Sequence, residues 1–538
     1  MTVYILIAVY ALGAAAMVYA SAGLIHMLQL EGYKNNNLIH WFGENAAKVN
    51  NLPVFVSAAA IALMLLTNAV FPSANLYIFF VLAAAYLLLI AVYAKRIRVE
   101  KAKKPLVYTS RVKRLFAFLS LVYAVIGAVL LLLDRLVLSD SLAAFMTLFV
   151  LFPLAGFGVL CANVLASPVE KSVQRWYFND AKKKLAERSD LIRIGITGSY
   201  GKTSCKFILG TILSEKYNVL VPPSSFNTPM GLTRVVREQM KPAHEVFIAE
   251  MGARHQGDIK ELCGLVYPKY GLITSVGPQH LETFGSIETI AKTKYELIES
   301  LPQDGCAFFP GDNDICRALY DKTLIEKKLF SIDYAGASDV RAENIQSGSF
   351  GSRFELVLDG ERVICETKLL GKHNISNIIG CAAVAHRLGL TATQIRLGIR
   401  KIQPVEHRLQ MLPTANGITV IDDAFNANPS GVRAAMEVLK GFTGRKVVVT
   451  PGMVELGDSE DDENRAFGRV MASAADLVML IGPKHTRPIY EGLLEGGFSE
   501  ENIQVYRSLD DAAKVLWTQV NPGDAVIFEN DLPDNYNE

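Results

Sequence analysis

The amino-acid sequence predicts an N-terminal five-helix transmembrane region followed by two α/β domains, a central one of the P-loop ATPase type and a Rossmann-like C-terminal one. Three observations support this fold class. The first 165 of the 538 residues are almost entirely apolar runs, whereas the remainder has an ordinary soluble composition. From residue 191 onward, short apolar strands alternate with amphipathic helical stretches, a pattern typical of mostly parallel sheets. A glycine-rich segment directly follows the first of these strands.

Length, charge and cysteine content exclude several classes of protein. A chain of 538 residues suggests about three domains. The net charge of +1 gives no case for nucleic-acid binding by the chain as a whole. The seven cysteines lack CxxC spacing and are odd in number. They therefore argue against a disulfide framework or a zinc ribbon, and for a reducing compartment.

Five apolar segments meet or nearly meet the length of roughly 20 residues that a bilayer-spanning helix needs. They are residues 3–30, 53–70, 76–94, 115–133 and 142–165. The first has no basic start and more spans follow it, so we expect it to be retained rather than cleaved as a signal peptide.

Lys and Arg residues in the short loops set the expected orientation. The loop at residues 95–114 carries nine of them and should be cytoplasmic, as should the basic segment that follows the fifth span. With five spans, the N-terminus then lies outside and the C-terminal two-thirds of the chain lies in the cytoplasm, where ATP is available.

Two loops of this region leave alternatives open. Residues 31–51 are polar and aromatic, and would form an interfacial anchor in the membrane lipids or contact a lipid-linked substrate. The basic loop at residues 95–114 is a topology signal, or it attracts the phosphates of an anionic lipid carrier.

The soluble part divides by its pattern into two α/β units. Residues 340–370 interrupt the alternation with predicted hairpins, one of them turning at Asp359-Gly360, which indicates a β insertion or a sheet edge. Residues 402–410 have the composition of a hinge. The expected domains are a transmembrane domain at 1–166, a basic cytoplasmic linker at 167–189, a central ATP-binding domain at 190–403 and a C-terminal domain at 404–538. Predicted strands lie at 191–197, 245–251, 270–276, 418–422, 446–450, 477–482 and 524–528.

The segment TGSYGKT after the first strand predicts a phosphate-binding loop. Backbone N–H groups in a glycine turn and at a helix N-terminus form an anion site. Lys202 would reach the β- and γ-phosphates, and Thr203 would offer its hydroxyl to Mg²⁺. The common pattern GxxxxGK[ST] is narrowly missed at Ile196, and the alternative is a structural glycine turn. The candidate loop residues are Thr197, Gly198, Ser199, Gly201, Lys202, Thr203 and Ser204.

Six further segments, in order, resemble the Mur ligase family, whose ATP-dependent members add amino acids to the peptidoglycan precursor. The loop itself has the family's TGxxGKT form, and within the family the segments most resemble the member that adds D-alanyl-D-alanine. The resemblance covers about residues 191–524. The segments are NTPMG (227–231), IAEMGARHQGDI (248–259), HLETFGSIETIAKTK (280–294), GKHNISNIIGCAAVA (371–385), HRL (407–409) and DDAFNANPSG (422–431).

The resemblance implies an ADP-forming ligase that joins a carboxylate to an amine through an acyl phosphate. Two anions must approach within bonding distance, so the reaction needs alignment and charge neutralisation more than covalent help. Metal ions and lysines supply that neutralisation. We expect ATP with two Mg²⁺ ions as cofactors, in a bacterial cytoplasmic membrane protein.

The metal-binding and catalytic residues are carried over from the family's motifs. Glu250 would bind Mg²⁺ at the end of its strand, or else cap a helix. His280 would bind the second Mg²⁺, or else be a capping or packing residue. Lys294 would carry a CO₂-derived carbamate that supports the metal site, or else be a solvated helix lysine. Thr203 completes the predicted metal set. Lys202, Glu250, His280, Lys294 and Arg408 form the predicted catalytic set.

The nucleotide contacts implied by the resemblance come from both α/β units. Asn313 and His373 would contact adenine, and Arg408 would reach the phosphates from the hinge. Closure of the C-terminal unit on the nucleotide would exclude water, which protects an acyl phosphate from hydrolysis. The remaining candidates are Asn374, Asn377, Asp423, Asn426 and Asn428.

Two departures from the family bear on the substrate. Membrane spans replace the family's N-terminal UDP-binding domain, and the acidic segment FENDLPDNYNE (528–538) stands where the D-alanyl-D-alanine member has a basic one. We therefore expect a lipid-linked carboxylate acceptor, with an amino acid or small peptide as the amine. The alternative is a membrane-tethered ligase that adds D-alanyl-D-alanine to the soluble UDP-linked tripeptide. An ATP-driven transporter and an inactive scaffold are the remaining alternatives, although few ionisable residues lie within the spans.

Overall fold

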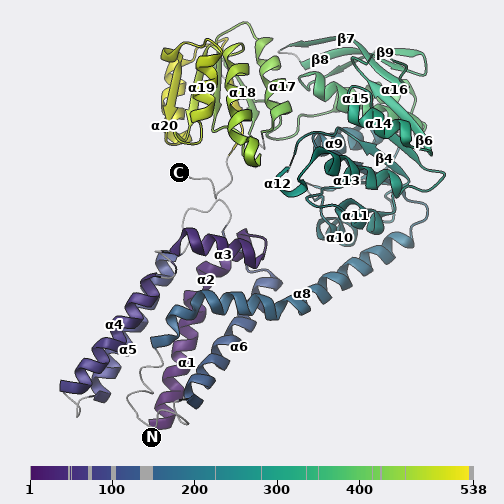
Figure 1. Ribbon diagram of the computed structural model, residues 1–538. Coiled ribbons are helices and arrows are strands. Elements are labelled where there is room, and N and C mark those ends of the chain that lie inside the picture. Colours follow the sequence, from purple (N-terminus) through teal and green to yellow (C-terminus); the bar gives the residue numbers. More distant parts are fainter. Residues whose placement is uncertain are drawn as a thin grey trace. The chain divides into compact units, whose positions relative to one another are not determined.

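The structure is a computed structural model whose chain divides into two compact units, Met1–Arg175 and Trp176–Glu538 (Figure 1). The first unit is helical, and the second contains two sheets covered by helices. The described residues are 2–46, 49, 51–70, 75–97, 105–133, 149–223, 226–279, 281–334, 336–348, 351–412, 414, 416–424, 427–454 and 456–531.

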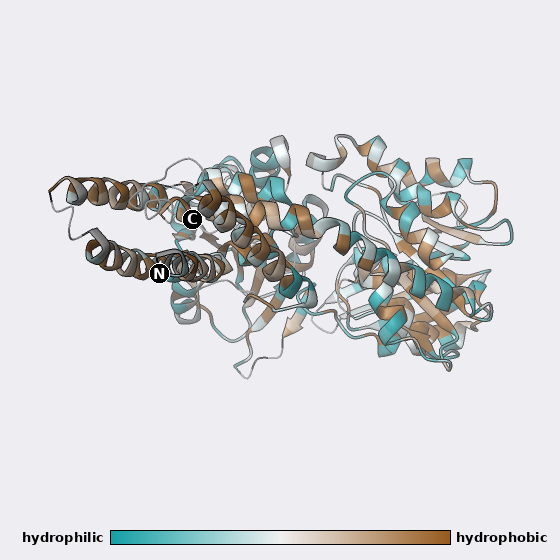
Figure 2. Cartoon of the chain, turned by 90° about the horizontal axis from the view of Figure 1, so that it is seen from below, coloured by the Kyte–Doolittle hydropathy of each residue, from teal (hydrophilic) through white to brown (hydrophobic). Residues whose placement is uncertain are grey.

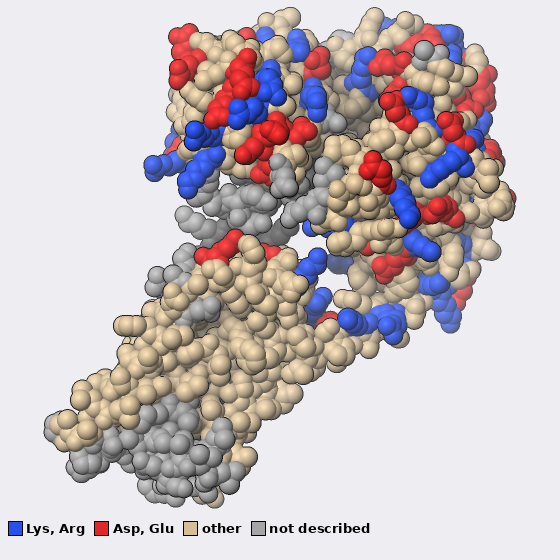
Figure 3. All heavy atoms as spheres, in the orientation of Figure 1, with Lys and Arg blue, Asp and Glu red and all other residues tan. Residues whose placement is uncertain are grey.

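Apolar residues predominate along the helices of the helical unit (Figure 2). Tyr4, Phe55 and Leu88 are 80%, 74% and 67% exposed, which soluble proteins rarely repeat over a whole surface. Lys, Arg, Asp and Glu gather instead on the α/β unit and along the second half of α8 (Figure 3). The helices are α1 (Thr2–Ala20), α2 (Ala22–Leu30), α3 (Asn35–Glu44), α4 (Leu52–Val70), α5 (Asn75–Ile97), α6 (Ser110–Leu133), the 3-10 turn η4 (Phe152–Leu154) and α8 (Ala155–Ala186).

Three helices among the described residues are long and apolar enough to cross a membrane: Tyr10–Leu30, Ser110–Leu130 and Phe152–Ala186. Two shorter apolar helices, Leu52–Thr67 and Phe80–Lys95, lie where the second and third spans were predicted. The five-span prediction is thus confirmed in part, and residues 142–148 of the fifth predicted span lie outside the described residues. The predicted linker at 167–189 is mostly helical, because α8 continues through Pro168 to Ala186.

The polar loop at residues 31–51 contains the helix α3, and its start is fixed to the helices α6 and α8. The Arg111 guanidinium lies 3.7 Å from the centre of the Tyr33 ring. Asn163 Nδ2 donates to the Tyr33 carbonyl at 3.0 Å and to Asn35 Oδ1 at 2.7 Å. Contacts within the unit therefore hold the start of this loop, and the two predicted roles of the loop stay predictions.

A nine-stranded sheet in the order β2-β3-β1-β4-β5-β6-β7-β8-β9 forms the first part of the α/β unit. Strands β2 to β7 pair in parallel, and β7, β8 and β9 pair antiparallel. The predicted hairpins are thus the edge of this sheet, and the turn between β8 and β9 has left-handed backbone at Asp359 (φ 45°) and Gly360 (φ 88°). The strands are β1 (Ile192–Thr197), β2 (Val219–Leu220), β3 (Val246–Glu250), β4 (Tyr270–Ile273), β5 (Cys306–Pro310), β6 (Glu326–Ser331), β7 (Val340–Gly348), β8 (Gly351–Leu358) and β9 (Glu361–Thr367).

Both faces of the parallel strands are buried under helices, so alternate side chains of one strand enter different cores. Ile248 packs in the core beneath α9 and α15, whereas its neighbours Phe247 and Ala249 pack beneath α10, α11 and α13. The helices are α9 (Lys202–Leu213), α10 (Pro229–Glu238), α11 (Asp258–Val266), α12 (Leu281–Phe284), α13 (Ile287–Glu299), α14 (Asp314–Lys322), α15 (Lys372–Arg387) and α16 (Ala392–Lys401).

The second sheet has the order β10-β11-β15-β12-β13-β14, and only β10 runs antiparallel to its neighbour. Both faces again carry buried cores. The strands are β10 (Gln410–Leu412), β11 (Thr419–Asp423), β12 (Lys446–Thr450), β13 (Leu477–Ile481), β14 (Ile503–Tyr506) and β15 (Ala525–Glu529). The helices are α17 (Pro429–Lys440), α18 (Glu460–Ala472), α19 (Arg487–Glu495) and α20 (Leu509–Gln519), with 3-10 turns η5 (Gly457–Ser459) and η6 (Glu500–Asn502).

All seven strands predicted in the soluble part are present, and the α/β class is confirmed. The sequence pattern did not single out β2, β5, β6, β10 or β14. The proposed boundary between a central and a C-terminal domain at residues 403 and 404 stays a prediction.

Candidate active site

The predicted phosphate loop joins β1, the third strand of the large sheet, to the N-terminus of α9. Ser199 is fixed on both sides, since its N–H donates to the Ser275 carbonyl at 2.8 Å and its Oγ donates to the Gly277 carbonyl at 2.9 Å. Thr197 Oγ1 donates to the Met251 carbonyl at 3.0 Å, which ties the loop to the end of β3. The loop is thus held from both neighbouring strands, and Ser204 is buried in the first turn of α9.

Both glycines of the loop are required by their surroundings. Gly198 has φ +151° and Gly201 has φ +79°, in the region that L side chains rarely adopt. A Cβ at Gly198 would lie 2.1 Å from Thr274 Oγ1, and one at Gly201 would lie 2.6 Å from Asn377 Oδ1. The tight turn therefore requires residues without a Cβ at these two positions, as expected of a loop that presents N–H groups to an anion.

The ammonium of Lys202 folds back onto the loop. Nζ donates to the carbonyls of Gly198 at 2.6 Å and Ser199 at 2.9 Å. Burial and the positive charge of Arg408 lower the pKa of Lys202 to about 8, although Glu250 opposes them. A bound polyphosphate would favour the charged ammonium in the same position.

Glu250 occupies the centre of the candidate site. Its carboxylate is 1% exposed at the end of β3. Oε1 accepts hydrogen bonds from Thr203 Oγ1 at 3.0 Å and Asn227 Nδ2 at 3.1 Å. Oε2 lies 3.2 Å from Nζ of Lys206, a fully buried lysine whose pKa burial lowers and Glu250 raises. Thr203 and Lys206 from α9, and Asn227 from the NTPMG segment, thus hold this carboxylate in place.

The hydroxyl of Thr203 and the carboxylate of Glu250 fit a magnesium site. Both are oxygen donors, and Mg²⁺ is commonly bound by one or two protein groups while phosphates and waters complete its shell. The described part of the chain has no group of three or more His, Cys, Asp and Glu residues that would hold a metal alone. His280, the predicted ligand of a second Mg²⁺, lies outside the described residues.

Lys294 is buried in α13 and is not the solvated helix lysine of the simplest alternative. The side chain is 3% exposed, and Nζ lies 5.7 Å from the centre of the Phe284 ring. Burial and the charge of Lys202 lower the pKa of Lys294 to about 7, against opposing contributions from Asp258 and Glu296. A lysine in this state is partly neutral at physiological pH, and only the neutral amine reacts with CO₂.

The three asparagines among the predicted base and ribose contacts are already hydrogen-bonded to the protein. Asn313 caps α14, with Oδ1 accepting from Cys316 N at 3.0 Å and Nδ2 donating to the Val276 carbonyl at 2.9 Å. Asn374 is buried and donates to the Leu370 carbonyl at 2.9 Å.

Asn377 accepts from Cys205 Sγ at 3.3 Å and lies directly against Gly201. His373 is exposed in the first turn of α15. The asparagines thus shape the loop and its borders, and direct contact of these four residues with nucleotide stays a prediction.

Arg408 approaches the phosphate loop from the predicted hinge. Burial lowers the pKa of its guanidinium, whereas Asp423 and Glu250 raise it, and Arg408 in turn lowers the pKa of Lys202. The structure therefore brings Arg408 within electrostatic reach of Lys202 and Glu250. Of the other predicted residues in this part, Asn428 caps α17 by accepting from Gly431 N at 2.9 Å, and Asn426 lies outside the described residues.

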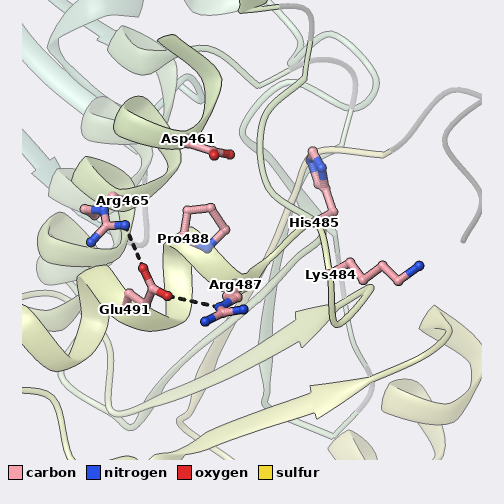
Figure 4. Close-up of a pocket in the computed structure, with 7 residues that line it drawn as sticks. All are labelled: Asp461, Arg465, Lys484, His485, Arg487, Pro488 and Glu491. Atoms are coloured by element: carbon pink, nitrogen blue, oxygen red, sulfur yellow. Dashed lines mark hydrogen bonds and ion pairs between the residues drawn. The ribbon is translucent and has the colours of Figure 1, made fainter. Parts of the chain in front are cut away.

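A cavity of about 490 Å³ lies beside the small sheet, between α18, α19 and the loop that joins β13 to α19 (Figure 4). Its walls carry more formal positive charge than negative charge. Glu491 binds two of the cations, Arg465 at 2.6 Å and Arg487 at 3.1 Å. The lining residues are Asp461, Arg465, Lys484, His485, Arg487, Pro488 and Glu491.

Three groups at the site were missed by sequence reasoning. Lys206 lies one helical turn after Lys202, so the i, i+4 spacing on α9 was the available signal. Asn227 was part of a quoted motif but had no assigned role. Glu529 is 1% exposed at the end of β15, beside Asp423 in the neighbouring strand, and only the strand pairing identifies it.

Two segments of the chain match known family models. Residues 196–385 match the Mur ligase middle domain, and residues 407–529 match a model described as the Mur ligase, glutamate ligase domain. The first match contains the phosphate loop, Glu250 and Lys294, and the second contains Arg408 and Glu529.

Named relatives and solved structures agree with these matches. The UDP-N-acetylmuramoyl-tripeptide–D-alanyl-D-alanine ligase of Mycobacterium bovis is 32% identical over 357 residues, covering 62% of this chain and 69% of that protein. The ligase of the same name from Bacillus subtilis is 29% identical over 340 residues, covering 62% and 72%. MurF from Acinetobacter baumannii aligns with a TM-score of 0.61 at 26% identity, covering 68% of this chain and 78% of that one. MurF from Thermotoga maritima in complex with ADP gives 0.60 at 25% identity, covering 66% and 80%. The chain therefore belongs to the Mur ligase family and is an ATP-dependent, ADP-forming ligase of peptide bonds.

Proposed function

We propose that this ligase adds D-alanyl-D-alanine, or a closely related dipeptide, to the carboxylate of a UDP-linked muramoyl tripeptide. The names of the relatives support this acceptor and amine. They favour the UDP-linked alternative over the lipid-linked acceptor that the membrane region had led us to expect. Family membership likewise favours a ligase over a transporter or an inactive scaffold.

The observation that carries the proposal is the joint placement of Thr203, Glu250 and Lys202 around one glycine loop. The loop would hold the β- and γ-phosphates of ATP on its N–H groups and on the N-terminus of α9. Lys202 would leave the carbonyls of Gly198 and Ser199 and neutralise the γ-phosphate. The acceptor carboxylate would then attack the γ-phosphorus and ADP would leave. The amine would attack the carbonyl carbon of the resulting acyl phosphate, displace phosphate and lose a proton to give the amide.

Thr203 and Glu250 would hold one Mg²⁺, with His280 proposed as a ligand of a second. The metal supplies charge neutralisation between the phosphates and the approaching carboxylate. Lys206 would keep Glu250 oriented toward the metal, because its ammonium lies 3.2 Å from Oε2 and both side chains are buried.

We propose that Lys294 reacts with CO₂ to form a carbamate at this site. Its burial and lowered pKa leave the reactive neutral amine available near pH 7. The change from cation to anion would convert a charge that repels Mg²⁺ into one that supports it.

Arg408, Asp423, Asn426 and Asn428 would act on the nucleotide from the C-terminal part. Asn313, His373, Asn374 and Asn377 would act on it from the central part. The cavity beside Lys484 would hold the carboxylate of the amine substrate, since Arg465, Lys484 and Arg487 all line it. This orientation would leave the substrate's amine free to attack.

A lipid-linked acceptor remains the second candidate, and the three apolar helices favour it. In that case the helical unit would be a multi-pass membrane region that presents the acceptor at the cytoplasmic face. In the first case the same helices would only tether the enzyme.

The test compares the two acceptors with the full-length protein in detergent micelles. ADP release and product mass are measured with UDP-linked muramoyl tripeptide or its undecaprenyl-linked counterpart, with D-alanyl-D-alanine as amine and with the Lys202→Met variant as the inactive control. We expect turnover with the soluble tripeptide that requires the amine and is lost in the variant. Turnover with the lipid-linked form alone would instead establish the second candidate, and turnover with neither would overturn both.

A further inference from the structure

The tripeptide His407-Arg408-Leu409 has an unusual backbone. His407 has φ +58° and Leu409 has φ +43°, so two residues with side chains flank Arg408 in the left-handed region. Such conformations persist only where the surroundings hold them, and they concentrate at functional sites. The question is which groups hold this segment.

Two aspartates at the end of β11 hold it. Asp422 Oδ2 lies 2.7 Å from His407 Nδ1, and Asp423 Oδ1 accepts from the Leu409 N–H at 3.0 Å. The hydrogen bond to Leu409 N requires an accepting oxygen on Asp423, and an ionised carboxylate makes it strongest. Asp423 also attracts the Arg408 guanidinium.

A second carboxyl group lies directly behind Asp423. Glu529 is its register partner in the parallel pair of β11 and β15, so the two carboxyl groups are neighbours, and Asp423 raises the pKa of Glu529. Glu529 is 1% exposed, and its Oε2 has no hydrogen-bond partner within the described part of the chain.

Two adjacent carboxylates cannot share a hydrogen bond without a proton between them. A buried anion with an unpartnered oxygen would be costly, whereas the carbonyl oxygen of a neutral acid costs much less. Burial and Asp423 both raise the pKa of Glu529, in agreement with a neutral acid. The structure therefore favours a protonated Glu529 that donates to an ionised Asp423.

We propose that Glu529 is a positioning residue of the ligase: as a neutral acid it fixes Asp423, which holds Leu409 and directs Arg408 toward the phosphate loop. This inference rests on the proposed role of Arg408 at the phosphates of ATP. It gives Glu529, which lies in the acidic segment 528–538, a function distinct from substrate recognition.

The experiment uses the full-length protein, four single variants and the double variant Arg408→Ala/Glu529→Leu. Glu529→Gln keeps a hydrogen-bond donor, and Glu529→Leu removes it at similar volume. Arg408→Ala tests the role on which the inference rests. Asp524→Asn is the matched control, because this buried acid stands just before β15. Among the described residues, its carboxylate accepts hydrogen bonds from the backbone N–H groups of Arg445 and Asn521, at 3.1 and 2.7 Å. Each is measured for melting temperature, affinity for the non-hydrolysable analogue AMP-PNP with Mg²⁺, and kcat and KM for ATP.

Glu529→Gln should stay within about twofold of the parent, whereas Glu529→Leu should lose roughly tenfold in kcat/KM for ATP and in AMP-PNP affinity. In the Arg408→Ala background, Glu529→Leu should cost little more, because both changes remove the same interaction. Asp524→Asn should lower the melting temperature without changing the affinity for AMP-PNP or kcat/KM for ATP.

An additive loss in the double variant, or equal losses in Glu529→Gln and Glu529→Leu, would overturn the positioning role while leaving the ligase intact. An Arg408→Ala variant with unchanged ATP affinity and turnover would instead contradict the role proposed for Arg408 itself. AMP-PNP binding is measured without an acceptor substrate, so both results can be obtained even if the natural acceptor is not the UDP-linked tripeptide.

Discussion

The hydroxyl of Thr203 and the carboxylate of Glu250 meet at 3.0 Å, although 47 positions separate them in the chain. The phosphate loop places the first at the start of α9, and the adjacent strand β3 places the second at its carboxyl end. Ligands gather at this edge of parallel sheets. The relationship joins the two motifs that the sequence suggests separately, and it supports the ATP site proposed at this edge.

Breaking the Glu250–Lys206 pair should destabilise the protein as well as inactivate it. Glu250→Leu leaves an uncompensated buried ammonium, a loss of about 3–5 kcal/mol in the free energy of unfolding. The double variant Glu250→Leu/Lys206→Met removes both charges and should recover most of that stability without recovering activity. Chemical denaturation with a parallel ADP-release assay checks this, and recovery of turnover in the double variant would exclude Glu250 as a metal ligand.

The state of Lys294 should make the enzyme dependent on CO₂ and pH. Since its pKa is about 7, the neutral amine predominates above that pH and the ammonium below it. Activation by added bicarbonate should therefore increase from pH 6 to pH 8, and Lys294→Ala should abolish it. Carbon-13 NMR with labelled bicarbonate should show a carbamate signal that is absent from the variant. A bicarbonate response that survives in Lys294→Ala would place the effect elsewhere.

Gly201→Ala should disturb the loop by more than its backbone strain. Its Cβ would lie 2.6 Å from Asn377 Oδ1, whereas Gly257, with a comparable φ of +94°, has no atom within 4 Å. Gly257→Ala is thus the matched control for left-handed strain alone, which costs roughly 1 kcal/mol. We expect Gly201→Ala to melt lower than the control and to lose AMP-PNP affinity. Equal effects in the two variants would show that Asn377 moves away freely.

The cavity beside Lys484 should affect the amine substrate and not ATP. Lys484→Met should raise the KM for D-alanyl-D-alanine roughly tenfold, since a charge-assisted hydrogen bond contributes about 1.5–3 kcal/mol. Lys514→Met on α20, whose side chain pairs with Asp511 outside the cavity, is the control and should behave as the parent does. A changed KM for ATP with an unchanged KM for the amine would remove this cavity from the amine site.

Much of the fold could be predicted because its signals are local. The strand–turn–helix around Gly201, the hairpin turn at Asp359-Gly360 and the alternation of strands and helices are all readable from short windows of sequence. The missed strands β5 and β6, CAFFP and EKKLFS, are recognised as strands only by their pairing with β4 and with each other.

The site was less predictable where it depends on contacts between distant segments. Lys206 and Glu529 are ordinary charged residues in the sequence, and only burial against Glu250 and Asp423 gives them significance. Asn313 and Asn428 have a structural role that the family resemblance did not suggest, because both cap helices. Their contact with nucleotide stays a prediction.

The most direct test of the central claim is the fate of an oxygen atom. UDP-linked muramoyl tripeptide, labelled with ¹⁸O in its acceptor carboxylate, is incubated with the full-length protein, ATP, Mg²⁺ and D-alanyl-D-alanine, and the released phosphate is analysed by mass spectrometry. An acyl phosphate route transfers one carboxylate oxygen, so we predict one ¹⁸O atom in the phosphate for each amide formed. Amide formation with unlabelled phosphate would contradict the mechanism.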